Sequence, residues 1–187
     1  MLIEYKSLEY HGKIVFEKMI MGHFNRAPKP YQENEACFMY LQEGAFQFRT
    51  PDKLFKMQQG DAILAKCGNY FFEQSSEDRI NFRQSSGIGA YLYPDVVKEL
   101  FDFDLSISDF QTSYGATNIN IDVLLKNFMD SIDFLLDNPS VCDNTMLKVK
   151  LQEFILLLSK SDNAPSLLDF ISALFKPHEY DFRRIIE

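Results

Sequence analysis

The sequence predicts an α+β protein in which a small antiparallel β-barrel is followed by an α-helical region. Two patterns support this class. From about residue 14 to residue 93, short apolar runs are separated by turn signals roughly eight residues apart, which is typical of an antiparallel barrel or sandwich. From residue 121 onward, apolar residues recur with the period of about 3.6 residues that marks amphipathic helices.

The strand-rich half consists of about six alternating segments bounded by Gly, Pro, Asn and Asp. The turn signals are Glu43-Gly44, Pro51-Asp52, Gln59-Gly60-Asp61, Cys67-Gly68-Asn69 and Glu77-Asp78. Phe46 and Phe48 share one face of their strand, and polar residues occupy the other. The segment from Ser85 to Gly89 lacks a nucleotide-binding fingerprint, and we interpret it as a strand bulge or a turn.

The second half is predicted to be helical. Pro94 opens a short helix over residues 94–101. A clean apolar stripe from Ile121 to Leu136 predicts a longer helix that ends at Asn138-Pro139. A further helix follows to residue 158, and another begins after Pro165.

The helix that ends at residue 158 has a second apolar face. Its members are Met146, Val149, Leu156 and Leu157. A helix that is apolar on two sides needs a partner on each side. This second face therefore either packs on the barrel or forms a dimer interface with another copy of the chain, and the sequence leaves both possibilities open.

The predicted elements divide the chain into a barrel over residues 1–105, a helical region over residues 106–176 and a short last part over residues 177–187. Residues 176–182 break the preceding helix, and residues 183–187 begin another of about one turn, which is too short to be stable alone. We expect this last part to be the start of a truncated domain.

Composition and motifs favour a non-enzymatic protein without a cofactor. The net charge of −8 argues against a DNA-binding surface within these residues. The histidines His11, His23 and His178 are too far apart to form a metal site, and no catalytic or nucleotide-binding motif occurs. The cysteines form no C-x-x-C pair, and no signal peptide or membrane span is recognisable, which predicts a cytoplasmic protein.

Residues 40–70 resemble a cupin barrel, because Gly44 and Gly60 stand where the two cupin motifs place their turn glycines. The positions of the cupin metal ligands fall on Tyr31, Glu33, Cys37 and Phe71. None of these matches the expected ligand, so the resemblance implies a barrel without a metal. An open barrel of this kind would have an apolar pocket. The inward positions predicted to line it are Cys37, Met39, Phe46, Phe48 and Phe71.

Residues 145–158, 167–171 and 182–187 resemble AraC-type transcriptional regulators, and most closely the branch of type III secretion activators. In that family a cupin-like regulatory domain leads through dimerising helices to two helix-turn-helix units. The resemblance implies a homodimeric cytoplasmic regulator that binds DNA only through a missing C-terminal domain, the start of which is residues 177–187.

The resemblance leaves the signal open between a small-molecule effector and an inhibitory protein. Some fatty-acid-sensing relatives pair the carboxylate with a lysine, but the strand from Ala36 to Leu41 contains no Lys or Arg. Two rival hypotheses remain. One is a stand-alone cupin that binds a small molecule or acts as an enzyme, and the other is a protein-interaction module with a filled barrel.

Overall fold

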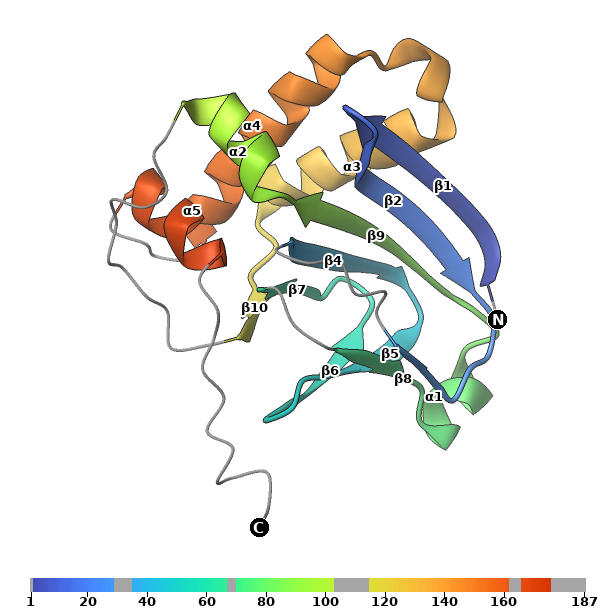
Figure 1. Cartoon of the computed structure of the whole chain (residues 1–187). Coiled ribbons are helices and arrows are strands. Elements are labelled where there is room, and N and C mark those ends of the chain that lie inside the picture. Colours follow the sequence, from blue (N-terminus) through green and yellow to red (C-terminus); the bar gives the residue numbers. More distant parts are fainter. Residues whose placement is uncertain (1, 29–34, 67–69, 103–114, 162–165, 176–187) are drawn as a thin grey trace.

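A computed structural model of the chain describes residues 2–28, 35–66, 70–102, 115–161 and 166–175. Within these residues the chain forms two antiparallel β-sheets and a group of helices (Figure 1). The predicted α+β class with antiparallel strands is confirmed. The described strands are divided between a six-stranded and a four-stranded sheet rather than closed into one barrel.

The two sheets pack face to face with an apolar core between them (Figure 1). The six-stranded sheet contains, in spatial order, β1 (Leu2–Tyr10), β2 (Lys13–Met21), β9 (Ser85–Leu92), β4 (Ala36–Glu43), β7 (Ala62–Ala65) and β10 (Ala116–Ile119). The four-stranded sheet contains β3 (Arg26–Pro28), β8 (Phe71–Glu73), β5 (Ala45–Arg49) and β6 (Leu54–Gln58).

The helices lie mainly against the outer face of the six-stranded sheet (Figure 1). They are α1 (Ser76–Asn81), α2 (Pro94–Phe101), α3 (Val123–Asp137), α4 (Asn144–Ser161) and α5 (Leu167–Phe175), with a 3₁₀ turn at Pro139–Val141. Asp122 caps α3, because its carboxylate accepts a hydrogen bond of 2.8 Å from the backbone N–H of Leu125. The helix ends where the Asn138-Pro139 signal predicts.

The side chains of β4 alternate between two cores. Phe38 and Tyr40 point toward the helices, whereas Cys37, Met39 and Leu41 point into the space between the sheets. The strand is therefore buried on both faces, which explains why its sequence is a nearly continuous apolar run.

The six-stranded sheet extends further than the sequence suggests. Residues 2–10 form β1 because His11 and Gly12, with φ angles of 50° and 76°, make a tight turn that returns the chain along β2. At the other edge, β10 lies between the predicted helices, where no strand was predicted, and pairs with β7. The sheet thus continues beyond residue 105, and residues 176–187 lie outside the described part of the chain.

The alternative of a turn at Ser85–Gly89 is wrong, since these residues belong to the central strand β9. The glycines are explained by close neighbours instead. A Cβ atom at Gly87 would lie 3.1 Å from the backbone oxygen of Tyr40, and one at Gly89 would lie 3.1 Å from the side chain of Glu17. A register shift does occur nearby, between Leu41 and Glu43 of the paired strand β4.

Candidate functional site: a cavity between the two sheets

A cavity of about 250 Å³ lies between the two sheets. One wall is formed by residues of β1, β2, β4 and β9, and Phe48 and Phe72 of the four-stranded sheet form the other. Most of the lining is apolar, and its polar groups are concentrated at Glu17 and two tyrosines. An apolar cavity with a few convergent polar groups is the usual form of a small-molecule site.

Glu17 on β2 is the acidic residue of this cavity. Only 5% of its surface is exposed. Its carboxylate accepts a hydrogen bond of 3.0 Å from the hydroxyl of Tyr5 and a second bond from the hydroxyl of Tyr91. Gly89 on the neighbouring strand leaves the space that the Glu17 side chain occupies. A buried carboxylate without hydrogen-bond partners is costly. The two phenols supply these partners and the glycine supplies the space, so Glu17 can be buried here.

The environment of Glu17 also fixes the protonation of the two phenols. Burial raises the pKa of Tyr5 to about 12, and the negative charge of Glu17 adds to the effect. Burial, followed by the charge of Glu17, raises the pKa of Tyr91 well above its ordinary range. Both hydroxyls therefore keep their protons at neutral pH and act as donors to Glu17.

Three of the residues predicted to form a pocket, Cys37, Met39 and Phe48, line this cavity. Phe46 is buried between the sheets but contacts Phe72, with 5.5 Å between ring centroids, and is not part of the lining. It borders a separate and more open depression of about 460 Å³ beside α1.

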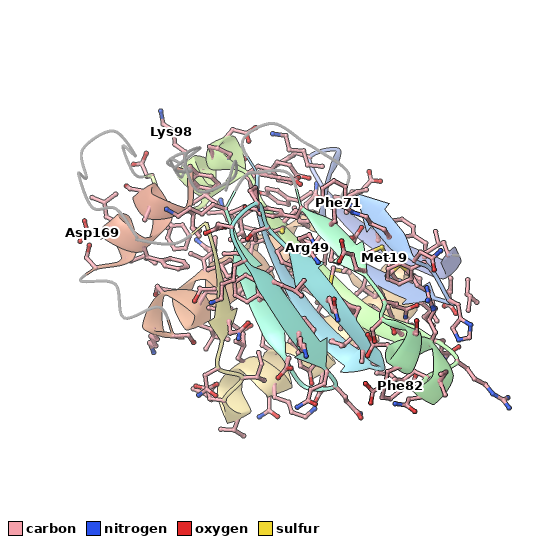
Figure 2. The ribbon with its side chains drawn as sticks, turned by 90° about the horizontal axis from the view of Figure 1, so that it is seen from below. Met19, Arg49, Phe71, Phe82, Lys98 and Asp169 are labelled. Carbon is pink, nitrogen blue, oxygen red and sulfur yellow. The ribbon has the colours of Figure 1, made fainter. Side chains whose placement is uncertain are left out.

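Phe71 does not point into the space between the sheets. Its neighbour Phe72 takes that place, and the Arg26 guanidinium lies 3.8 Å from the centre of the Phe71 ring on the other face of β8. Arg49 pairs with Phe71 in the strand register, and the two lie close together in Figure 2. There Arg49 donates a hydrogen bond of 2.9 Å to Glu73. Since β8 has only three residues, alternation in the sequence could not set its inward face.

Glu17, Tyr5 and Tyr91 were not predicted from the sequence to belong to the site. Tyr5 belongs to a strand that was not predicted. Glu17 follows the buried Phe16 and precedes Lys18, which faces the helices, so the local sequence shows no simple alternation. The sequence offers one indication. Glu17 and Met19 are two residues apart and so lie on the same face of β2, and Met19 packs against the core between the sheets.

The second apolar face of α4 is mostly exposed. Met146, Val149 and Leu156 are 40%, 57% and 44% exposed, respectively. Leu157 is half-buried and packs against the core beneath the helices. Three of the four predicted dimerisation residues thus form an apolar surface on α4 that no other described part of the chain covers.

Two of the four cupin ligand positions fall within the described residues. Cys37 lines the cavity, whereas Phe71 lies on the opposite face of its sheet. Tyr31 and Glu33 are outside the described residues. Across the ranges that the structure covers, no group of three or more His, Cys, Asp or Glu side chains is arranged to hold a metal ion. None of the helices in those ranges is long and apolar enough to cross a membrane.

Two sheets with a cavity between them and helices packed on one outer face form a cupin-like fold. A family model described as the ExsA N-terminal regulatory domain matches residues 36–170, and the chain belongs to this family. The predicted relationship to AraC-type regulators of the secretion-activator branch is thereby confirmed. No curated protein matches the chain by sequence.

Solved structures of ToxT from Vibrio cholerae have a similar fold. Unsaturated fatty acid-bound wild-type ToxT is similar with a TM-score of 0.54 and 9% identity over 87% of this chain and 58% of ToxT. ToxT bound to (E)-4-(8-methylnaphthalen-1-yl)but-3-enoic acid gives a TM-score of 0.54 and 10% identity over 91% of this chain and 63% of ToxT. For an apo ToxT structure the TM-score is 0.52, and the chain spans 60% of its length.

Proposed function

We propose that the chain is the effector-sensing and self-associating part of an AraC-type transcriptional regulator. The observation that carries this proposal is the cavity between the sheets, with its single polar centre at Glu17. A small molecule in that cavity would be the signal. The chain would act in the cytoplasm, as a regulator and not as an enzyme.

The route from the cavity to the helices supports the proposal. In β2, Glu17 and Met19 face the cavity, while Phe16 lies under α3 and α4. The Phe16 ring lies 6.1 Å from that of Phe128 on α3 and 6.0 Å from that of Phe154 on α4. A ligand that moves β2 would therefore shift the surface on which both helices rest.

Occupancy of the cavity is testable through Cys37, which lines it and is 7% exposed. In a variant with Cys67→Ser and Cys142→Ser, a bound ligand should slow the alkylation of Cys37 by iodoacetamide. The matched control retains Cys142 as its single cysteine in place of Cys37. Cys142 lies just before α4, and its alkylation should proceed at the same rate with or without ligand. A screen of small molecules that never protects Cys37 would count against a ligand-sensing function.

We further propose that the exposed face formed by Met146, Val149 and Leu156 mediates homodimerisation. Exposed apolar residues on one face of a helix are typical of a docking surface. Leu156→Glu should convert a dimer to a monomer in sedimentation experiments at micromolar concentration. Ile80→Glu, the same change at a residue 84% exposed on α1, should leave the dimer intact. A wild-type monomer would contradict homodimerisation and leave the face to an inhibitory protein.

DNA binding would belong to a further C-terminal domain of the full regulator. The acidic chain, with a net charge of −8, is a poor ligand for a phosphate backbone. The alternative is a stand-alone cupin, either a non-metal binding protein or an enzyme. Metal analysis of the purified protein tests the metalloenzyme, because stoichiometric iron, manganese or zinc would favour it.

A further inference from the structure

The charge of the cavity lining points to the class of ligand. Glu17 is buried, and its carboxylate is hydrogen-bonded by two neutral phenols. Among the described residues that line the cavity there is no lysine, arginine or histidine. Phenols satisfy the carboxylate as hydrogen-bond donors, but they bring no positive charge to it.

Two described lysines on the strands that line the cavity, Lys18 and Lys6, pair with carboxylates outside it. Lys18 follows Glu17 in β2 but points to the helices, where its amine lies 2.6 Å from the carboxylate of Asp133. Lys6 on β1 pairs with Glu4 at 2.8 Å and with Asp137 at 2.7 Å. A ligand carboxylate in the cavity would thus meet a negative charge with no cation among the described lining residues to offset it, and this arrangement is costly away from water.

We propose that the cavity binds a small amphiphile with a cationic head, such as an alkylammonium ion, with the head beside Glu17 and the apolar tail among Met19, Met39 and Phe48. This inference rests on the sensing function proposed above and names its ligand class. A volume of about 250 Å³ suits a small molecule rather than a drug-sized one. A charge-assisted hydrogen bond to Glu17 would give the head group its specificity.

Calorimetric titration of the 187-residue chain with hexylamine, hexanol and hexanoate tests the proposal, because these probes share one tail and differ in the head. Hexylamine is protonated at neutral pH, as lysine is. It should bind about tenfold or more tightly than hexanoate, which is the size of effect expected for one charge-assisted hydrogen bond. Equal or tighter binding of hexanoate would overturn the cationic class while leaving a sensing cavity.

Two variants separate Glu17 from the general acidity of the protein. Glu17→Gln should weaken hexylamine about tenfold and leave hexanol little changed. Glu9→Gln removes the same charge from an exposed position of β1 and should leave both affinities unchanged. Equal weakening of hexylamine by both variants would overturn the assignment to Glu17.

A measurement with Glu17 intact guards against a Glu17→Gln variant that fails to fold. In the variant that retains only Cys37, hexylamine should slow alkylation at concentrations where hexanoate does not. Protection by hexanoate alone would overturn the cationic class. If none of the three probes binds or protects, the proposed ligand class fails, whereas the sensing function fails only if the wider screen of small molecules never protects Cys37.

Discussion

On the face of the six-stranded sheet that the helices cover, aromatic rings fill the space, whereas a cavity remains on the face toward the smaller sheet. Phe154 of α4 lies 5.2 Å from Phe38 and 5.3 Å from Phe128, measured between ring centroids. The last pair is stacked, with 13° between the ring planes. This outer core is closely packed and leaves little freedom to its members.

The inner face instead combines adaptable and polar side chains. Met19, Met39 and Cys37 border the cavity, and Glu17 sits there between two tyrosines. Methionine side chains adjust easily to a ligand of irregular shape. The same strands therefore hold a closely packed core on one side and an adaptable, partly open lining on the other.

The largest expected effect tests the packing of the outer face. Phe154→Ala should lower the free energy of unfolding by about 4 kcal/mol, because the side chain is fully buried among aromatic rings. Urea unfolding followed by circular dichroism measures the loss. Phe134→Ala, at a position 61% exposed on α3, is the control and should cost less than about 0.5 kcal/mol. Similar losses in both variants would contradict a close-packed outer core.

Shortening a side chain on the inner face should lower the free energy of unfolding by a smaller amount. Met39→Ala should lower the free energy of unfolding by about 2 kcal/mol, at the low end for a buried methionine, because the side chain already borders empty space. The same urea titration applies. A loss as large as that of Phe154→Ala would remove the contrast between the two faces.

The polar centre should show a pH signature. Tyr91→Phe should lower the free energy of unfolding by about 1.5 kcal/mol at neutral pH, because Glu17 loses a hydrogen-bond donor. Burial raises the pKa of Tyr91 above its ordinary value of 10.0, so the folded state holds this proton more tightly. The contribution of Tyr91 to stability should therefore be constant below about pH 10 and be lost as the pH rises further, so the stability of the variant should fall less steeply above about pH 10. Parallel curves would contradict the buried Tyr91–Glu17 contact.

The smallest effect is expected on the outer face of the four-stranded sheet. The hydrogen bond from Arg49 lowers the pKa of Glu73 below its ordinary value of 4.5. The stabilisation is thus present above about pH 4.5 and is lost as the pH falls through the lower, folded-state pKa. Because Arg49 is 42% exposed, it should amount to less than about 1 kcal/mol. Glu73→Gln should flatten the acid side of the stability curve, and an unchanged curve would contradict the pair.

Periodic features could be predicted because each depends on neighbours in the sequence. The stripe from Ile121 to Leu136 indicated α3, and its end at Asn138 was also correct. Gly44 and Gly60 marked turns, and they have φ angles of 90° and 91° that favour glycine. The short β8 gave no such periodicity, which is why Phe71 was assigned the wrong face.

The candidate site was only half predictable. Cys37 and Met39 lie on a strand long enough for parity to be assigned, and they line the cavity as expected. Glu17 could not be found in this way, because β2 is covered on both faces and its polar residues have different partners on each. The partner Tyr5 lies on a strand whose existence depends on its pairing with β2.

The sequence by itself determined the α+β class, the succession of a strand-rich half and a helical half, and the apolar faces of α3 and α4, since these follow from residue periods and turn chemistry along the chain. Only the tertiary structure decided that two sheets enclose a cavity, that Glu17 faces it and that the Met146 and Val149 side chains stay exposed. The physical reason is that burial of a strand or helix face depends on elements distant in the chain, and a local pattern does not reveal which element covers it.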